Sequence, residues 1–219
     1  MKKVCIFDFD GTLLNTVVDA AICYNKALEI HGFKTHPIEQ YGSFFGGNID
    51  TIVKRILEGN ENVTQEDRNK IKHAYIELYL NSTKENTVPY EGIMELLENL
   101  QSNGVKLAIN TNKRQVLVDE LCEKHFPNIK FERIIGNIEN YPSKPDPQAV
   151  YDILECCNEE KDKAVYIGDG KTDIKTAANA GIDMIFVEWG QGTEEDKKMD
   201  TINHVVSTAD EIFKIVMQK

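Results

Sequence analysis

Short apolar runs that alternate with segments of helical periodicity are the feature that most limits what this sequence can fold into. The runs Val4–Phe7, Val105–Ile109 and Ala164–Ile167 are largely apolar, as expected for strands that are covered on both faces. Ile182–Val187 and His204–Val206 are predicted as two further strands. Strands that alternate with helices form parallel sheets with helical crossovers. The pattern therefore predicts an α/β fold, with a Rossmann-like parallel sheet in a three-layer α/β/α core.

The helices between these strands are predicted from apolar residues spaced i, i+3, i+4 and i+7. One such helix contains Ile93 and Leu100 and ends before Gly104. A second follows Pro147, a residue type that is favoured in the first turn of a helix. Ser207–Asp210 resembles a capping box and predicts a last helix that begins there.

Residues 16–85 interrupt this alternation with helical patterns and no convincing strand. Because this segment directly follows the first strand, we predict a catalytic core of residues 1–15 and 86–219 and an inserted helical cap of residues 16–85. The polar stretch Asn81–Asn86 is the predicted return linker. The apolar stripes of the cap are Val17–Leu28, Ile49–Leu57 and Ile71–Leu78, the last preceded by Thr64 and Asp67 as a capping pair.

The 36 acidic residues outnumber the 25 basic ones and give a formal net charge of −11. This balance argues against nonspecific nucleic-acid binding and against docking on anionic membranes, since both need a basic surface. We expect neither a signal peptide nor a membrane span, because the apolar run after the N-terminal lysines is short. The five cysteines lack zinc-ligand spacing and are expected to be reduced thiols. The expectation is a soluble, cytoplasmic protein.

Polar and charged residues follow the predicted strands. Ligands of open parallel sheets bind at the carboxyl ends of the strands, so these residues define a candidate site. Several carboxylates at one edge repel each other, which implies a divalent cation, and oxygen ligands favour Mg²⁺. A hydroxyl with an ammonium group suits a phosphoryl group. The residues concerned are Asp8, Asp10, Thr111, Asn112, Lys113, Lys144, Asp169 and Asp173.

Four motifs in this order resemble those of the haloacid dehalogenase-like hydrolase superfamily: IFDFDGTL at Ile6–Leu13, NTNK around Thr111, SKPDP around Lys144 and GDGKTD at Gly168–Asp173. The helical insertion also sits where one large subgroup carries its cap. The TNK and KPDP segments are similar to the phosphoglycolate phosphatase branch. The resemblance implies a Mg²⁺-dependent phosphatase that acts on small phosphomonoesters such as phosphoglycolate.

The resemblance further implies a role for each motif residue. Asp8 would attack phosphorus as the nucleophile and form an aspartyl-phosphate. Asp10 would protonate the leaving alkoxide and later deprotonate the attacking water, for which the chain must leave extended geometry after Phe9. Thr111 and Lys144 would hold the transferring phosphoryl oxygens.

The metal ligands implied by the resemblance are Asp8, the backbone carbonyl of Asp10, and Asp169. Asp173 would be an occasional ligand, or would orient Mg²⁺-bound water or Lys144.

Further residues are candidates for substrate binding. Asn112 and Lys113 follow the second strand, and Lys113 would supply positive charge for a substrate carboxylate. In the cap, the segment Tyr41–Asn48 is glycine-rich and aromatic, and Gly47 and Asn48 would present polar groups to a substrate. A helix-to-helix loop packed by its two phenylalanines is an equally good interpretation.

Other activities stay open at this point. A pyrophosphatase or a sugar-phosphate mutase of the same superfamily would carry the same cap. A receiver-like module that is phosphorylated on aspartate also uses acids, a threonine and a lysine at strand ends, but it lacks a helical insert. The expected partner is a small phosphorylated metabolite, and the expected assembly is a monomer or homodimer.

Overall fold

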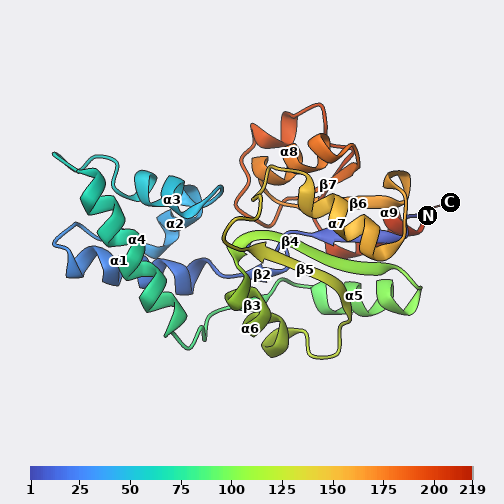
Figure 1. Ribbon diagram of the computed structural model, residues 1–219, viewed down its shortest axis with the longest axis horizontal. Coiled ribbons are helices and arrows are strands. Elements are labelled where there is room, and N and C mark those ends of the chain that lie inside the picture. Colours follow the sequence, from blue (N-terminus) through green and yellow to red (C-terminus); the bar gives the residue numbers. More distant parts are fainter. Residues whose placement is uncertain (219) are drawn as a thin grey trace. The chain divides into compact units, whose positions relative to one another are not determined.

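The computed structural model describes residues 1–218 of the chain. They form two compact units, one of Met1–Leu14 with Pro89–Lys219 and the other of Asn15–Val88. The chain leaves and re-enters the first unit through two short strands, β2 (Leu14–Asn15) and β3 (Val88–Pro89), that pair with each other. The second unit is thus an insertion into the first (Figure 1).

The first unit is built on a six-stranded parallel sheet of order β5-β4-β1-β6-β7-β8. Strand β1 lies between β4 and β6, and Phe7 at its end pairs with Ile109 and Ile167. The residues that follow these strands therefore meet at one edge of the sheet. The strands are β1 (Val4–Phe7), β4 (Lys106–Arg114), β5 (Phe131–Asn137), β6 (Ala164–Gly168), β7 (Asp183–Val187) and β8 (His204–Val206).

Alternate residues of each strand enter the hydrophobic cores on the two faces of the sheet, because successive side chains of a strand point in opposite directions. Cys5 and Phe7 join the core under α5, α6 and α9, whereas Val4 and Ile6 join the core under α7 and α8. Figure 1 shows the sheet between these layers, as predicted for an α/β/α sandwich. The helices are α5 (Ile93–Ser102), α6 (Gln115–His125), α7 (Gln148–Cys157), α8 (Lys171–Ala180) and α9 (Ala209–Met217).

Strand β4 and helices α6 and α9 differ from the sequence-based prediction. Strand β4 extends to Arg114, with a register shift against β5 after Asn110, so Thr111–Lys113 belong to an irregular strand end and do not follow the strand. Helix α6 was not predicted, although its buried residues at positions 117, 118, 121 and 122 have helical spacing. The capping box of α9 joins Thr208 and Glu211, one residue later than expected.

The insert is a small helical domain with its own core. Helices α1 and α4 pack together, and the ring of Tyr24 stacks on that of Tyr75 with 3.7 Å between centroids. The predicted Thr64–Asp67 capping box opens α4. The helices are α1 (Val17–Ile30), α2 (Tyr41–Phe44), α3 (Ile49–Ile56) and α4 (Gln65–Leu80).

The predicted return linker Asn81–Asn86 is packed more closely than its polar composition suggests. Lys84 is buried, and its ammonium group donates to the backbone carbonyl of Ser82 at 3.1 Å. The buried carboxylate of Asp19 accepts hydrogen bonds from Asn86 at 2.9 Å and from Thr87 at 2.7 Å. These bonds fix the segment because a buried carboxylate must be satisfied by donors.

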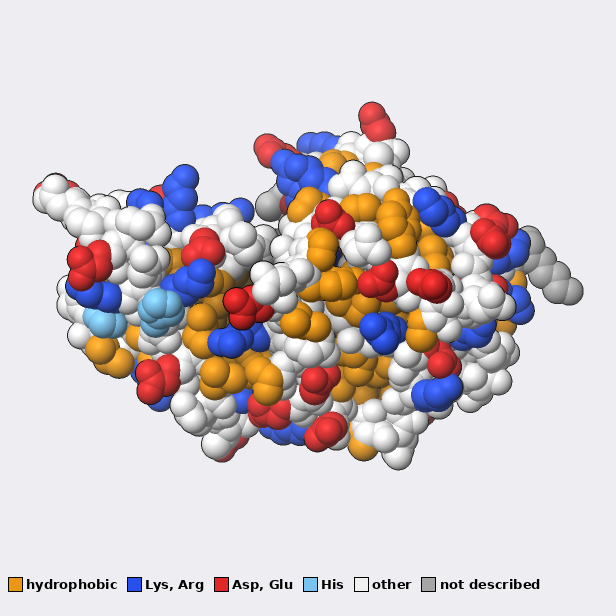
Figure 2. All heavy atoms as spheres, viewed as in Figure 1, with side chains coloured by type: hydrophobic (Ala, Val, Ile, Leu, Met, Phe, Trp, Pro, Cys, Tyr) orange, Lys and Arg blue, Asp and Glu red, His pale blue; other side chains and the backbone are white. Residues whose placement is uncertain are grey.

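Three features of the protein bear on the predictions made from its composition. No helix among residues 1–218 is long and apolar enough to cross a lipid bilayer. All five cysteines are free thiols. On the face shown in Figure 2, acidic and basic side chains are interspersed and do not gather by sign.

Candidate active site

Asp8 comes directly after β1 and is buried at the carboxyl edge of the sheet. Its Oδ1 accepts the backbone N–H of Phe9 at 2.6 Å and lies 2.8 Å from Nζ of Lys144. The chain then turns at Gly11, whose φ of 83° lies in the left-handed region that favours glycine. A side chain at Gly11 would also collide with the carboxylate of Asp169. The chain thus leaves extended geometry after Phe9, as predicted.

Lys144 lies in the loop between β5 and α7, and only 3% of its side chain is exposed. Its Nζ lies 2.8 Å from Asp8 and 2.7 Å from Oδ1 of Asp173. Burial opposes its charge, but the neighbouring carboxylates of Asp173 and Asp8 more than offset burial and raise the pKa of Lys144 well above its usual range. Lys144 is therefore a fixed cation between two carboxylates.

Asp169 and Asp173 are both buried after β6. Asp169 accepts the hydroxyl of Thr12 at 2.9 Å and the backbone N–H of Gln191 at 2.8 Å, one on each carboxylate oxygen. Asp173 accepts the backbone N–H of Gly170 at 2.9 Å with Oδ2, which caps α8, while its Oδ1 faces Lys144. Asp173 therefore holds Lys144 and caps α8 at the same time.

The three carboxylates form a site whose chemistry fits a divalent cation. Oxygen atoms of Asp8, Asp169 and Asp173 all lie within 4.8 Å of one another. Burial, followed by the charge of Asp173, raises the pKa of Asp8 to about 7 and that of Asp169 to about 8. The Lys144 ammonium group contacts two of these three carboxylates, so their mutual repulsion is only partly offset. A hard cation such as Mg²⁺ prefers oxygen donors of this kind.

Residues Thr111–Lys113 contribute three different contacts at the end of β4. Oγ1 of the buried Thr111 accepts the backbone N–H of Lys113 at 3.2 Å. Asn112 donates through Nδ2 to the backbone carbonyl of Lys144 at 3.3 Å and so tethers the Lys144 loop. Nζ of Lys113 lies 2.8 Å from Oδ1 of Asp10. The structure thus places Asn112 and Lys113 against protein groups of the site.

A family model described as haloacid dehalogenase-like hydrolase matches residues 5–187. The chain belongs to this family. It is 29% identical over 192 residues to a phosphoglycolate phosphatase of Aquifex aeolicus, with 86% of this chain and 85% of that protein covered. The identity to a phosphoglycolate phosphatase of Psychrobacter arcticus is 30% over 200 residues, covering 89% and 87%.

A solved structure agrees over the whole length. A protein of Lactobacillus delbrueckii subsp. bulgaricus, proposed to be a phosphoglycolate phosphatase, superposes with a TM-score of 0.91 at 30% identity, and all of both chains is covered. Together with the family match and the curated relatives, this makes the chain a phosphatase of the haloacid dehalogenase-like family.

Gly47 and Asn48 of this hydrolase belong to the helical insert. The carboxamide oxygen of Asn48 accepts from the backbone N–H and the hydroxyl of Thr51, both at 3.0 Å, and so caps α3. Phe44 and Phe45 pack against the core of the insert. These contacts support the interpretation of this segment as a helix-to-helix loop, with Asn48 in a structural role.

A loop that sequence analysis did not select completes the hydrolase site. It follows β7, and Nε1 of Trp189 donates to the backbone carbonyl of Thr12 at 3.1 Å. The backbone N–H of Gln191 holds Asp169, and the Gln191 side chain donates to the hydroxyl of Tyr90 at 3.2 Å. This loop directly follows the predicted strand Ile182–Val187. Ligands of parallel sheets bind at the carboxyl ends of strands, so its position in the sequence is the signal that indicates it.

The close approach of this loop gives a testable prediction for Gly190. A Cβ at this position would overlap Cβ and the carboxylate of Asp169. We expect Gly190→Ala to destabilise the protein by about 1–3 kcal/mol, the usual cost of overpacking. Displacement of Asp169 should also lower kcat/KM by about 10²-fold. Thermal unfolding and initial rates measure the two effects.

Gly42→Ala is the matched control, since a Cβ at that position would meet nothing within 4 Å. It should leave kcat/KM unchanged and should not lower the stability, since alanine is favoured over glycine within a helix such as α2. Full activity of Gly190→Ala would show that the loop after β7 does not hold Asp169 in its working position.

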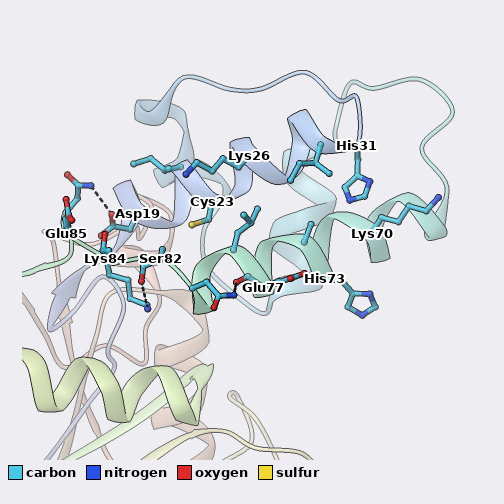
Figure 3. Close-up of a pocket in the computed structure, with 17 residues that line it drawn as sticks. Asp19, Cys23, Lys26, His31, Lys70, His73, Glu77, Ser82, Lys84 and Glu85 are labelled. Atoms are coloured by element: carbon cyan, nitrogen blue, oxygen red, sulfur yellow. Dashed lines mark hydrogen bonds between the residues drawn. The ribbon is translucent and has the colours of Figure 1, made fainter.

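The insert contains a separate pocket of about 930 Å³ between α1, α4 and the segment Asn81–Asn86. Figure 3 shows Cys23 and Lys26 of α1 and His73 and Glu77 of α4 around it. All of its lining residues lie between positions 19 and 86, outside the four motifs. The buried carboxylates around Lys144 are therefore a better indication of the active site than the size of this pocket.

Proposed function

We propose that this hydrolase is a Mg²⁺-dependent phosphatase that cleaves small phosphomonoesters of the phosphoglycolate kind through an aspartyl-phosphate on Asp8. The observation that carries the proposal is the buried contact between the Asp8 carboxylate and Lys144 at 2.8 Å, with Asp169 alongside. A nucleophile beside a fixed cation is the arrangement that phosphoryl transfer requires, because the cation stabilises the charge on the phosphoryl oxygens. The phosphoglycolate phosphatases among its relatives support the substrate class.

In the first half of the reaction, a carboxylate oxygen of Asp8 attacks phosphorus while the bond from phosphorus to the ester oxygen breaks. Lys144 and the hydroxyl of Thr111 hold the phosphoryl oxygens. Asp10, in its protonated form, donates its proton to the departing alkoxide, which leaves as an alcohol. The products of this half are the alcohol and the aspartyl-phosphate.

In the second half, water attacks the phosphorus of the aspartyl-phosphate. The carboxylate of Asp10, left deprotonated by the first half, takes a proton from this water. The bond from phosphorus to the Asp8 oxygen breaks, which releases inorganic phosphate and restores the Asp8 carboxylate. The same residue thus acts first as acid and then as base, and both protonation states are regenerated in each cycle.

Mg²⁺ would be held by Asp8, Asp169 and the backbone carbonyl of Asp10. When bound, it supplies positive charge that offsets the carboxylates and the phosphoryl oxygens. Asp173 keeps Lys144 in place beside the site, since it shares that ammonium group with Asp8. The free thiols are in keeping with a cytoplasmic enzyme, which we also propose.

A substrate panel tests the proposed function. Initial rates of phosphate release with Mg²⁺ should give the highest kcat/KM on 2-phosphoglycolate, with lower values on pyrophosphate and hexose phosphates. Isomerised hexose phosphate without phosphate release would indicate a mutase instead. Efficient hydrolysis of a phosphopeptide, with negligible rates on every small ester, would contradict the proposed substrate class.

A further inference from the structure

Lys113 and Asp10 form an ion pair between the irregular end of β4 and the loop after β1. Nζ of Lys113 lies 2.8 Å from Oδ1 of Asp10, and the two residues are 103 positions apart in the sequence. The Lys113 side chain is only 8% exposed, whereas that of Asp10 is 34% exposed. The cation is therefore largely buried, whereas the carboxylate is partly exposed to solvent.

The backbone of Lys113 is fixed as well as its side chain. Its N–H donates to Oγ1 of Thr111 at 3.2 Å, which forms a tight turn at the end of β4. The preceding residue, Asn112, is bound to the carbonyl of Lys144. The Lys113 end of the ion pair thus starts from a well-supported backbone, so the pair restricts where the Asp10 carboxylate points. Exposed pairs on mobile side chains lack this property.

We propose that Lys113 is a positioning residue that holds the general acid and base, Asp10, in its working orientation. The inference rests on the proposed function, in which Asp10 exchanges protons with the leaving group and with water. Lys113 holds Oδ1 of Asp10 and so restricts the directions in which this carboxylate can point. A general acid must lie within hydrogen-bonding distance of its target, and a misplacement of about 1 Å costs about 10²-fold in rate.

This role differs from the one predicted from sequence, in which Lys113 binds a substrate carboxylate. A substrate contact would change KM for substrates that bear a carboxylate. A positioning role would change the rate with every substrate whose leaving group needs a proton, whether or not it bears a carboxylate. The two roles therefore predict different results for substrates that differ in their leaving group and in whether they bear a carboxylate.

The experiment compares Lys113→Met and Lys113→Arg on three esters. 2-Phosphoglycolate and ethyl phosphate both have alkoxide leaving groups that need a proton, but only the first bears a carboxylate. p-Nitrophenyl phosphate has a stable leaving group that departs without a proton. Because kcat/KM reports steps up to leaving-group departure, it isolates the acid role of Asp10.

We expect Lys113→Met to lower kcat/KM on both alkyl esters to a similar extent, by about 10–10²-fold, and to leave kcat/KM on p-nitrophenyl phosphate close to wild type. On that ester kcat should still fall, with phosphoenzyme accumulating, because Asp10 also activates the water. Lys113→Arg keeps a donor for Asp10 and should retain most of the activity. If the Met variant unfolds, Lys113→Leu, which also lacks a donor, serves the same comparison.

Two outcomes would overturn the proposal. An equal loss of kcat/KM on all three esters would mean that Lys113 only maintains the fold. A rise in KM confined to 2-phosphoglycolate would mean that it binds the substrate carboxylate.

The variant Asp10→Asn shows whether the positioning role of Lys113 or the proposed function itself is wrong. If Asp10→Asn discriminates between leaving groups and Lys113→Met does not, only the positioning role is wrong. If neither discriminates, the acid role of Asp10 is wrong too.

Discussion

Asp8→Asn is expected to abolish phosphatase activity, with a loss on the order of 10⁴–10⁶-fold, as seen when a covalent nucleophile is removed from other hydrolases. The carboxamide lacks the negative charge needed to attack phosphorus. The substitution leaves Lys144 paired with Asp173 at 2.7 Å, so the site keeps its main ionic contact. It also removes one of three clustered carboxylates, which relieves repulsion. We therefore expect the thermal stability at neutral pH to be retained.

The measurement combines initial rates with mass spectrometry of the acid-quenched enzyme after mixing with substrate. The wild type should carry one phosphoryl group on the peptide that contains Asp8, and the variant none. Asp200→Asn is the control, since Asp200 is exposed and lies outside the site. Turnover by Asp8→Asn near the wild-type rate would show that another residue is the nucleophile.

Much of this site could be predicted from the sequence because it is built at strand ends. Apolar strands such as Val4–Phe7 are easily recognised, and in a parallel sheet their carboxyl ends share one edge. The structure indeed brings Asp8, Lys144, Asp169 and Asp173 together there. Their roles follow from the family resemblance.

The remaining contacts depend on tertiary geometry that local patterns do not encode. Lys113 contacts Asp10 because β4 continues irregularly past Asn110, and the sequence predicted that the strand ends at Ile109. Gln191 reaches Asp169 through its backbone N–H, a group that every residue except proline carries. No residue preference marks such a contact in a sequence.

The polar segment Asn81–Asn86 is a second case in which local sequence does not predict tertiary contacts. Its composition is typical of a solvated linker. In the structure it is ordered around a buried carboxylate, that of Asp19, with Lys84 buried as well. A local composition argument has no information about a partner 67 residues away.

Removal of divalent metal should abolish activity and lower the melting temperature of the protein. A cation that binds only the folded state stabilises it by about 2.7 kcal/mol at a free concentration 100-fold above its Kd. For a chain of this length that corresponds to about 5–10 °C in Tm. EDTA should cause both losses and added Mg²⁺ should reverse them. Ca²⁺ should inhibit, because its larger and looser coordination shell misplaces the nucleophile. Asp169→Ala should sharply raise the Mg²⁺ concentration needed for activity. Full activity of the unmodified protein in EDTA would contradict the metal requirement.

The pH dependence of this stabilisation follows from the raised pKa values of Asp8 and Asp169, about 7 and about 8. Both exceed the value of about 4 for an unfolded aspartate. Without metal, these groups therefore contribute stability that is complete below about pH 4 and is lost as the pH rises through 7 to 8. Mg²⁺ binds the deprotonated carboxylates. At about pH 6 it must displace their protons, which weakens binding, whereas at about pH 9 the carboxylates are already deprotonated. The rise in Tm on adding Mg²⁺ should accordingly be larger at the higher pH, and an equal rise at both would show that the cation does not bind to these two carboxylates.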